Sequence, residues 1–155
     1  MPNWCNNILT VSGTASSVNK FVKEVQRDVT YPGEKKVHLP FSFEKICPTP
    51  EALKNDEWQN NAIIAEANTK KYGYKGWYDF HCDEWGTKWE LSSDTTVRKD
   101  KGKVTYSFQT AWSPPVPLIT KASKLYPDLK FELRFCEEGM EFDGVFTARR
   151  GRSVK

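Results

Sequence analysis

The segment Leu-Lys-Phe-Glu-Leu-Arg-Phe, residues 129–135, alternates apolar and charged side chains along its whole length. Successive side chains of an extended chain point to opposite faces, so the apolar residues share one face and the charged residues the other. This pattern predicts an antiparallel strand with one side against a core and one side in water. Residues 104–112 repeat the pattern, with Val104, Tyr106 and Phe108 on one side, after a polar hairpin tip at 98–103. Together the two segments predict a sheet with one open face.

The other elements can be placed outward from these two strands. Residues 16–29 and 117–126 carry apolar residues at helical spacing. Further strands are predicted at 4–11, from Trp89 onward, and at 140–146. The order predicts an α+β protein with the ferredoxin-like split β-α-β fold and an added C-terminal strand. We expect four or five strands, both helices on one face, and a shared core of Val22, Val25, Leu118, Leu125, Phe131 and Phe135. On the open face we expect Lys88, Glu90, Lys130, Glu132, Arg134, Glu141, Asp143 and Arg149.

The chain is expected to form a single domain over residues 1–148, because 155 residues suit one core. A helical, aromatic-rich insertion is predicted at about 39–87, with an extended stretch at 39–47 and helices at 51–58 and 60–70. Residues 149–155 form a basic C-terminal tail that we expect to fray. Without its four basic residues the body has 19 basic against 20 acidic residues. Such a body is less basic than is usual for proteins that grip nucleic acid.

Composition argues against membrane, secreted and metal-binding classes. The longest apolar runs are a few residues, and the N-terminus lacks the pattern of a secretory signal, so we expect a cytoplasmic protein. The four cysteines form no Cys-x-x-Cys pair, and with two histidines they fit no standard zinc spacing. We therefore expect no metal or cofactor, and four reduced, mostly buried thiols at Cys5, Cys47, Cys82 and Cys136.

Several motifs together resemble the YubB ferredoxin-like family. They are Met1-Pro2-Asn3-Trp4-Cys5-Asn6-Asn7, Trp85-Gly86-Thr87-Lys88-Trp89, Thr110-Ala111-Trp112-Ser113-Pro114-Pro115, Glu137-Glu138-Gly139 and Phe142-Asp143-Gly144. This resemblance spans nearly the whole chain. It implies the same fold and an origin in a phage, plasmid or other mobile element. It implies no catalytic residues, because the family is a domain of unknown function.

The densest feature is the aromatic segment 72–89, where lysines and glycines separate the rings. Tryptophan and tyrosine offer large contact areas at low entropy cost, so such a segment suits a binding surface. The candidate partner-binding residues are Tyr74, Lys75, Trp77, Tyr78, Lys88 and Trp112. Trp85 and Trp89 are expected instead to anchor the insertion to the sheet.

These features favour a non-enzymatic protein that binds a host or mobile-element protein through the aromatic insertion and the open sheet face. An inhibitor of a host defence system is one form, which rests on the implied origin alone. A first alternative is weak nucleic-acid binding through Lys101, Lys103, Arg149, Arg150 and Arg152. A second is a small enzyme. It would use Pro2 as a base after removal of Met1, or the cluster Asp79, His81, Asp83 and Glu84. The sequence specifies no oligomeric state.

Overall fold

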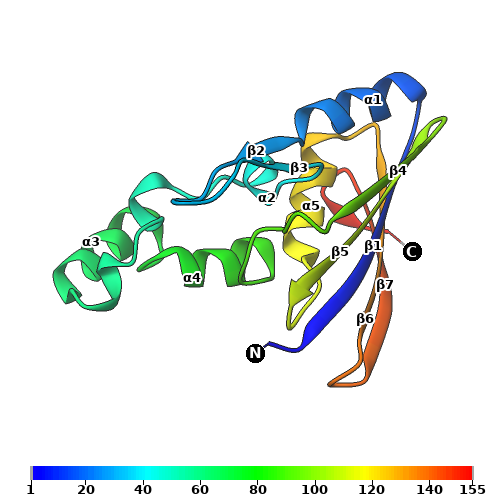
Figure 1. Ribbon diagram of the computed structural model, residues 1–155. Coiled ribbons are helices and arrows are strands. Elements are labelled where there is room, and N and C mark those ends of the chain that lie inside the picture. The colour runs from blue at the N-terminus through cyan, green and yellow to red at the C-terminus, as the bar shows by residue number, and fades with distance from the viewer. Residues whose placement is uncertain (1, 155) are drawn as a thin grey trace.

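The computed structural model describes residues 2–154, and its centre is a six-stranded antiparallel sheet in the order β4-β5-β1-β6-β7-β8 (Figure 1). The strands are β1 Trp4–Ser12, β4 Thr96–Asp100, β5 Lys103–Ala111, β6 Lys130–Glu137, β7 Phe142–Arg149 and β8 Arg152–Ser153. Among the strands of this sheet, β1 lies between β5 and β6, and β4 lies at an edge beside β5. This is the ferredoxin-like arrangement, and β7 is the added strand predicted from the sequence. The predicted fold class is therefore confirmed. The expected number of four or five strands was too low, because the short β8 also pairs with β7.

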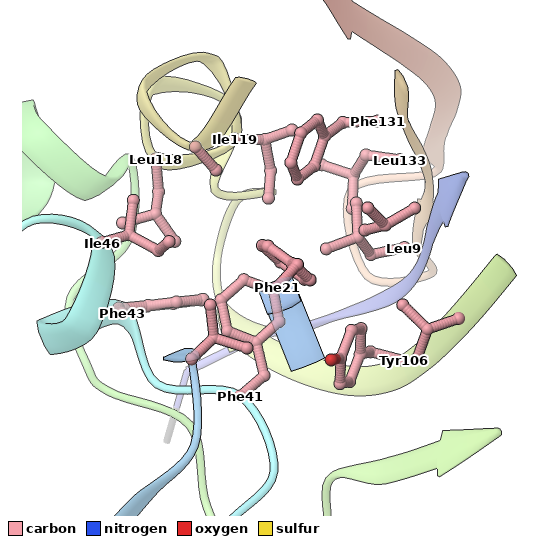
Figure 2. Packing of buried hydrophobic residues seen from close by; sticks show 14 of the residues in the cluster. Leu9, Phe21, Phe41, Phe43, Ile46, Tyr106, Leu118, Ile119, Phe131 and Leu133 are labelled. Carbon is pink, nitrogen blue, oxygen red and sulfur yellow. The ribbon is translucent and has the colours of Figure 1, made fainter. Parts of the chain in front are cut away.

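Helices α1 (Ala15–Glu24) and α5 (Val116–Leu125) pack on one face of the sheet. The core between them joins Phe21 of α1 with Phe131 of β6 at 5.5 Å between ring centroids (Figure 2). The expected core residues Val22, Val25, Leu118 and Phe131 are buried together. Two of the expected residues were wrong: Leu125 is 58% exposed, and Phe135 is half-buried at the core margin. Leu125 ends its helix, and the next residue, Tyr126, packs its ring on Phe21 instead, at 5.0 Å.

The first helix is shorter than the predicted range 16–29. It ends at Glu24, and residues after it form β2 (Arg27–Val29), which pairs with β3 (Val37–Leu39). The Asp28 carboxylate holds this hairpin, at 2.8 Å from His38 Nδ1 and 3.2 Å from Lys36 Nζ. Val29 is buried in β2 rather than in a helix. Its spacing from the apolar residues of α1 was compatible with a helix, but it is equally compatible with this strand. The departure from the ferredoxin-like core thus starts well before residue 39.

The chain between β3 and β4 forms an arm that extends to one side of the sheet (Figure 1). Its elements are α2 Phe43–Ile46, 3-10 turns at Glu51–Leu53 and Glu57–Gln59, α3 Ala62–Tyr72, α4 Trp77–Phe80 and a π-helical turn at His81–Trp85. The helix predicted at 60–70 is confirmed as α3. The extended stretch predicted at 39–47 was wrong beyond Leu39, because the chain bends at residues 40–41 and then forms the helix α2. The helix predicted at 51–58 is two short turns.

Lys88 and Glu141 were expected on the open sheet face, and this was wrong because neither lies in a strand. Glu90 was expected there as well, and this too was wrong. Its carboxylate is largely buried and accepts hydrogen bonds from Phe43 N at 2.8 Å, Glu44 N at 3.0 Å and Ser42 Oγ at 2.7 Å. It thereby caps the start of α2. No strand begins at Trp89, since β4 starts at Thr96. Residues 86–95 instead carry the chain from the arm back to the sheet edge.

The basic C-terminal residues are ordered rather than frayed as far as residue 154. Arg149 lies in β7, and β8 turns back to pair with it. Arg150 and Gly151 form the turn with positive φ values of 54° and 78°. Gly151 N donates to Ser123 Oγ of α5 at 2.9 Å. Lys155, like Met1, lies outside the described residues.

Two general expectations can be compared with residues 2–154. None of the helices in this part of the chain has the length and apolar character needed to cross a membrane. Cys5 is buried and Cys47 half-buried, but Cys82 and Cys136 are exposed. The expectation of mostly buried thiols was therefore wrong for half of them.

Candidate binding surface

Four exposed aromatic rings gather where the arm rejoins the sheet. Trp4, Trp89 and Trp112 are 40%, 40% and 44% exposed, and Tyr78 is 37% exposed. With Lys88 they form what we call the tryptophan surface. Large apolar rings are rarely left together in water unless they bind something, so this cluster is the leading candidate site.

The rings and the lysine of this surface contact one another closely. The Trp89 ring centroid lies 6.1 Å from that of Trp4 and 6.5 Å from that of Trp112, the latter pair being stacked. The Nζ atom of Lys88 lies 4.5 Å from the ring centre of Trp89, 5.4 Å from Tyr78 and 5.6 Å from Trp112. A cation over several aromatic faces is held by their negative quadrupoles. The lysine therefore fixes the rings in one arrangement.

Three distant segments build this surface: the start of β1, the end of the arm and the end of β5. Trp112 N donates to Asn3 O at 2.8 Å, and Thr87 Oγ1 donates to Ala111 O at 3.0 Å. These bonds hold the arm and both strands together. The same three segments contain the first three motifs quoted above.

Trp112 has a backbone conformation that a bulky residue seldom adopts. Its φ is 65°, in the left-handed region that normally favours glycine. Such a residue costs on the order of 1–3 kcal/mol and persists where the surrounding structure imposes it, often at functional sites. At this position glycine would give a more stable backbone, yet the chain has a tryptophan whose indole is exposed to solvent.

Trp85 anchors the arm as predicted, whereas Trp89 does not. The Trp85 ring is fully buried, stacks on the His81 ring at 3.7 Å, and donates from Nε1 to Cys47 O at 2.8 Å. Trp89 was expected to anchor the fold because it was assigned to a strand. Outside any strand its ring is free to face solvent.

The six predicted partner-binding residues lie in three places. Tyr78, Lys88 and Trp112 belong to the tryptophan surface. Tyr74 and Lys75 lie elsewhere: the Tyr74 hydroxyl lies within hydrogen-bond distance of both Asp83 and Glu84, and Lys75 pairs with Asp79 at 3.8 Å. Burial and these two carboxylates raise the pKa of Tyr74.

Trp77 occupies a third location in the arm. Its Nε1 donates to Asp56 Oδ1 at 2.8 Å, and its ring lines a cavity of 480 Å³. It is therefore close to the tryptophan surface without belonging to it.

The cluster at 79–84 does not form a joint carboxylate site. Glu84 pairs with Lys121 at 2.8 Å, and this ion pair and the hydrogen bond with Tyr74 lower the pKa of Glu84. The His81 ring instead contacts Thr49. Its Nδ1 lies 2.7 Å from Lys88 O and therefore carries a proton, leaving Nε2 at 2.9 Å from Thr49 Oγ1. Over residues 2–154 no group of three or more His, Cys, Asp or Glu side chains could hold a metal ion.

The residues of the nucleic-acid alternative share one end of the sheet. Strand register places Lys103 opposite Ser12, Ser12 opposite Lys130, and Arg149 opposite Arg152, all on the open face. Lys130 and Arg149 also adjoin each other, because Phe131 pairs with Ala148. A row of four exposed basic residues, Lys103, Lys130, Arg149 and Arg152, therefore crosses the sheet, with Lys101 and Arg150 in the turns at its ends. Sequence reasoning missed Lys130 as a member, because only the register joins it to the others.

Pro2, the residue of the enzyme alternative, is half-buried and lines a 310 Å³ hollow with Glu137, Glu138 and Gly139. The hollow includes Trp4, so it adjoins the tryptophan surface. Trp4 and Trp89 are the two members of that surface that sequence reasoning did not assign to it. The signal for Trp4 was available, since its even-numbered neighbours in β1 face outward.

Comparison with known proteins agrees with this architecture. A family model described as a ferredoxin-like domain in Api92-like protein matches residues 84–155. The crystal structure of protein api92 from Yersinia pseudotuberculosis has a similar fold, with a TM-score of 0.63 and 11% identity over 100% of this chain and 97% of that one. No curated protein matches. The matched family is described by api92 rather than by the YubB name, and its function is not known. Residues 84–155 thus match the ferredoxin-like domain of Api92-like protein, and the whole chain has the fold of api92.

Proposed function

We propose that this protein is a non-enzymatic binding protein and that its tryptophan surface receives a protein partner. The observation that carries this proposal is the stacked, exposed set Trp4, Trp89 and Trp112 around Lys88. Tryptophan is among the residues most enriched in the energetic centres of protein interfaces. A rigid cluster also loses little side-chain entropy when a partner binds.

The charge around the surface favours a protein over a nucleic acid at this place. The hollow of 340 Å³ between Trp4 and Trp89 is also lined by Glu90 and Asp94. The exposed carboxylate of Asp94 beside the rings would repel a phosphate backbone, and the Lys88 ammonium is already held over the ring of Trp89. A protein partner can meet the same groups with its own amides and cations.

The open face of the sheet can extend the contact area. Trp4 lies on the outward side of β1 with Ile8, which is 46% exposed, and Val145 of β7 is 55% exposed. A hollow of 590 Å³ lies over these strands, with Ile8 and Val145 in its lining. A partner can therefore cover both the tryptophan surface and the adjacent sheet face. Inhibition of a host defence system is one form of this function, and it rests only on the mobile-element origin implied by the sequence resemblance.

Interface variants with a matched control test the proposal. Purified protein is used to capture partners from host lysate, and each captured partner is then assayed against Trp89→Ala, Trp112→Gly and the control Ile63→Ser. Ile63 is 81% exposed on α3, far along the arm. We expect the control to bind normally and each tryptophan variant to lose about 2 kcal/mol or more, which is roughly thirtyfold. A partner that binds all three variants equally would contradict the proposal.

A second candidate function has one specific observation in its favour. Arg149 and Arg152 stand directly opposite each other in adjacent strands, although like charges at such positions repel. A bound phosphate would relieve this repulsion, so the basic row suits a single-stranded nucleic acid crossing the sheet.

Fluorescence anisotropy with a labelled oligonucleotide, measured at several salt concentrations, tests this second function. Contacts by the row predict a log–log salt slope of about −0.7 for each neutralised phosphate. They also predict a smaller slope for Lys130→Gln and no change for Lys70→Gln on the exposed side of α3. Equal slopes for all three proteins would exclude the row as a phosphate site.

A further inference from the structure

An open cavity of 480 Å³ lies between the arm and the β2–β3 hairpin, and it shares Trp89 and Glu90 with the 340 Å³ hollow described above. Small-molecule sites usually measure about 300–1,000 Å³. The rings of Tyr31, Trp77 and Trp89 contribute to its walls, together with the carboxylates of Glu44 and Asp56. These residues come from the β2–β3 hairpin, α2, the loop before α3, α4 and the segment after the π-helical turn. The cavity is thus assembled by the folded arm.

The two carboxylates are held in place by neutral donors. Glu44 accepts from Thr49 N at 2.9 Å, and the Thr49 hydroxyl lies between Glu44 and His81 Nε2, so its single proton serves one of the two. Asp56 accepts from Trp77 Nε1 at 2.8 Å and from Gln59 Nε2 at 3.1 Å. A carboxylate has about four lone-pair positions, so both retain free acceptor capacity.

In the described part of the chain, neither Glu44 nor Asp56 forms an ion pair. Lys54 also lines the cavity, but its ammonium pairs with Glu51 at 3.0 Å. Burial lowers the pKa of His81, which favours its neutral form on the cavity wall. Glu90 also lines the cavity, with Arg27 Nη1 at 3.5 Å from its carboxylate. The negative charge of the cavity is therefore carried mainly by Glu44 and Asp56.

We propose that this cavity binds an organic cation, either a guanidinium or an alkylammonium group. Aromatic faces attract such a cation through their quadrupoles, and the carboxylates complete its charge and hydrogen-bond requirements. The cation is either a free small molecule or an arginine or lysine side chain of a partner. The inference does not depend on the tryptophan surface binding a protein.

Titration of ¹⁵N-labelled protein, followed at the six tryptophan indole signals, tests the proposal directly. The probes are agmatine as a free cation, N-acetyl-arginine methylamide as a blocked side chain, and its citrulline counterpart as a neutral control. We expect saturable shifts of the Trp77 and Trp89 indoles with at least one cation and none with the citrulline compound. Agmatine alone would indicate a free small molecule. Stronger binding of the blocked arginine would indicate a partner side chain.

Charge-removing variants separate this site from nonspecific attraction. Asp56→Asn keeps an oxygen for Trp77 Nε1 but removes the charge. We expect Asp56→Asn to bind the cation roughly fivefold more weakly, which corresponds to the loss of one contact of about 1 kcal/mol. Glu57→Gln, an exposed neighbour outside the cavity, should bind as the wild type does. Absence of Trp77 and Trp89 shifts with both cations, equal binding of the citrulline compound, or unchanged affinity in Asp56→Asn would each overturn the proposal. Partner binding through Trp112 is measured separately and is unaffected by these outcomes.

Discussion

Truncating Trp85 and Trp89 separately distinguishes a fold anchor from a binding residue, although the two tryptophans are only four positions apart. Trp85→Ala removes a fully buried ring that stacks on His81 and packs edge-on against Phe43 at 5.6 Å. Loss of a buried aromatic ring costs about 3–5 kcal/mol. The Cys47 carbonyl also loses its donor, which adds about 1 kcal/mol. We therefore expect Trp85→Ala to lower the free energy of unfolding by roughly 4–6 kcal/mol.

Trp89→Ala should cost much less, because its ring is 40% exposed and contacts mainly other surface rings. Two aromatic pairs at about 0.5–1.5 kcal/mol each suggest a loss of about 1–3 kcal/mol. For a chain of this size, 1 kcal/mol shifts Tm by about 2–4 °C. Expected shifts are thus roughly 8–24 °C for Trp85→Ala and at most about 12 °C for Trp89→Ala.

Equilibrium urea unfolding monitored by circular dichroism, with thermal melts alongside, measures both free energies. Trp85→Phe serves as an intermediate variant that keeps a ring but loses the bond to Cys47, in case Trp85→Ala does not fold. If Trp89→Ala destabilises as strongly as Trp85→Ala, the tryptophan surface is a structural cluster. The reasoning that made it a binding site would then fail.

Three further predictions concern stability. Glu90→Gln should lower the free energy of unfolding in urea by about 2–4 kcal/mol. An amide cannot accept from all the donors at Phe43, Glu44 and Ser42, and it leaves Arg27 without its counter-charge. A loss below about 0.5 kcal/mol would refute this capping role. Because the folded pKa of His81 lies below its ordinary value of 6.5, the unfolded state binds more protons just below pH 6.5. The contribution of neutral His81 to the free energy of unfolding is complete above pH 6.5 and declines on acidification. The wild type should therefore lose more stability than His81→Gln between pH 7.5 and 5.5. Equal losses in the two proteins would contradict this prediction. Trp112→Gly should be more stable than Trp112→Ala by about 1 kcal/mol, since only glycine adopts a φ of 65° without strain, and melts showing the reverse order would exclude strain there.

The sheet was predictable because most of its strands carry period-two patterns that place their apolar residues on one face. Leu129, Phe131 and Leu133 must share the buried face, and the structure places them there. The arm was less predictable, because its segments are short and pack by individual contacts. Val25 and Val29 fit a helical stripe, yet the ion pairs of Asp28 favour a hairpin that no periodicity reveals.

The candidate sites depend on contacts between distant segments, and this limits what sequence shows. Tyr78, Lys88 and Trp112 were identified by composition, but their meeting with Trp4 follows from strand register. Glu90 looked like a solvent-exposed strand residue, although it is a buried cap for a helix about 46 positions earlier in the chain. The basic row is visible only when β5, β1, β6 and β7 are placed side by side.

The two edges of the sheet bear on how this protein can associate with others. A free edge presents unpaired backbone groups that invite another strand, and proteins discourage this with charges and very short edge strands. Here one edge is β4, whose sequence Thr-Val-Arg-Lys-Asp is fully exposed and mostly charged, and the other is the two-residue β8. Both ends of the sheet therefore resist fibre-like growth by strand addition. Recognition is left to side chains, and the tryptophans stand where side chains of three segments meet.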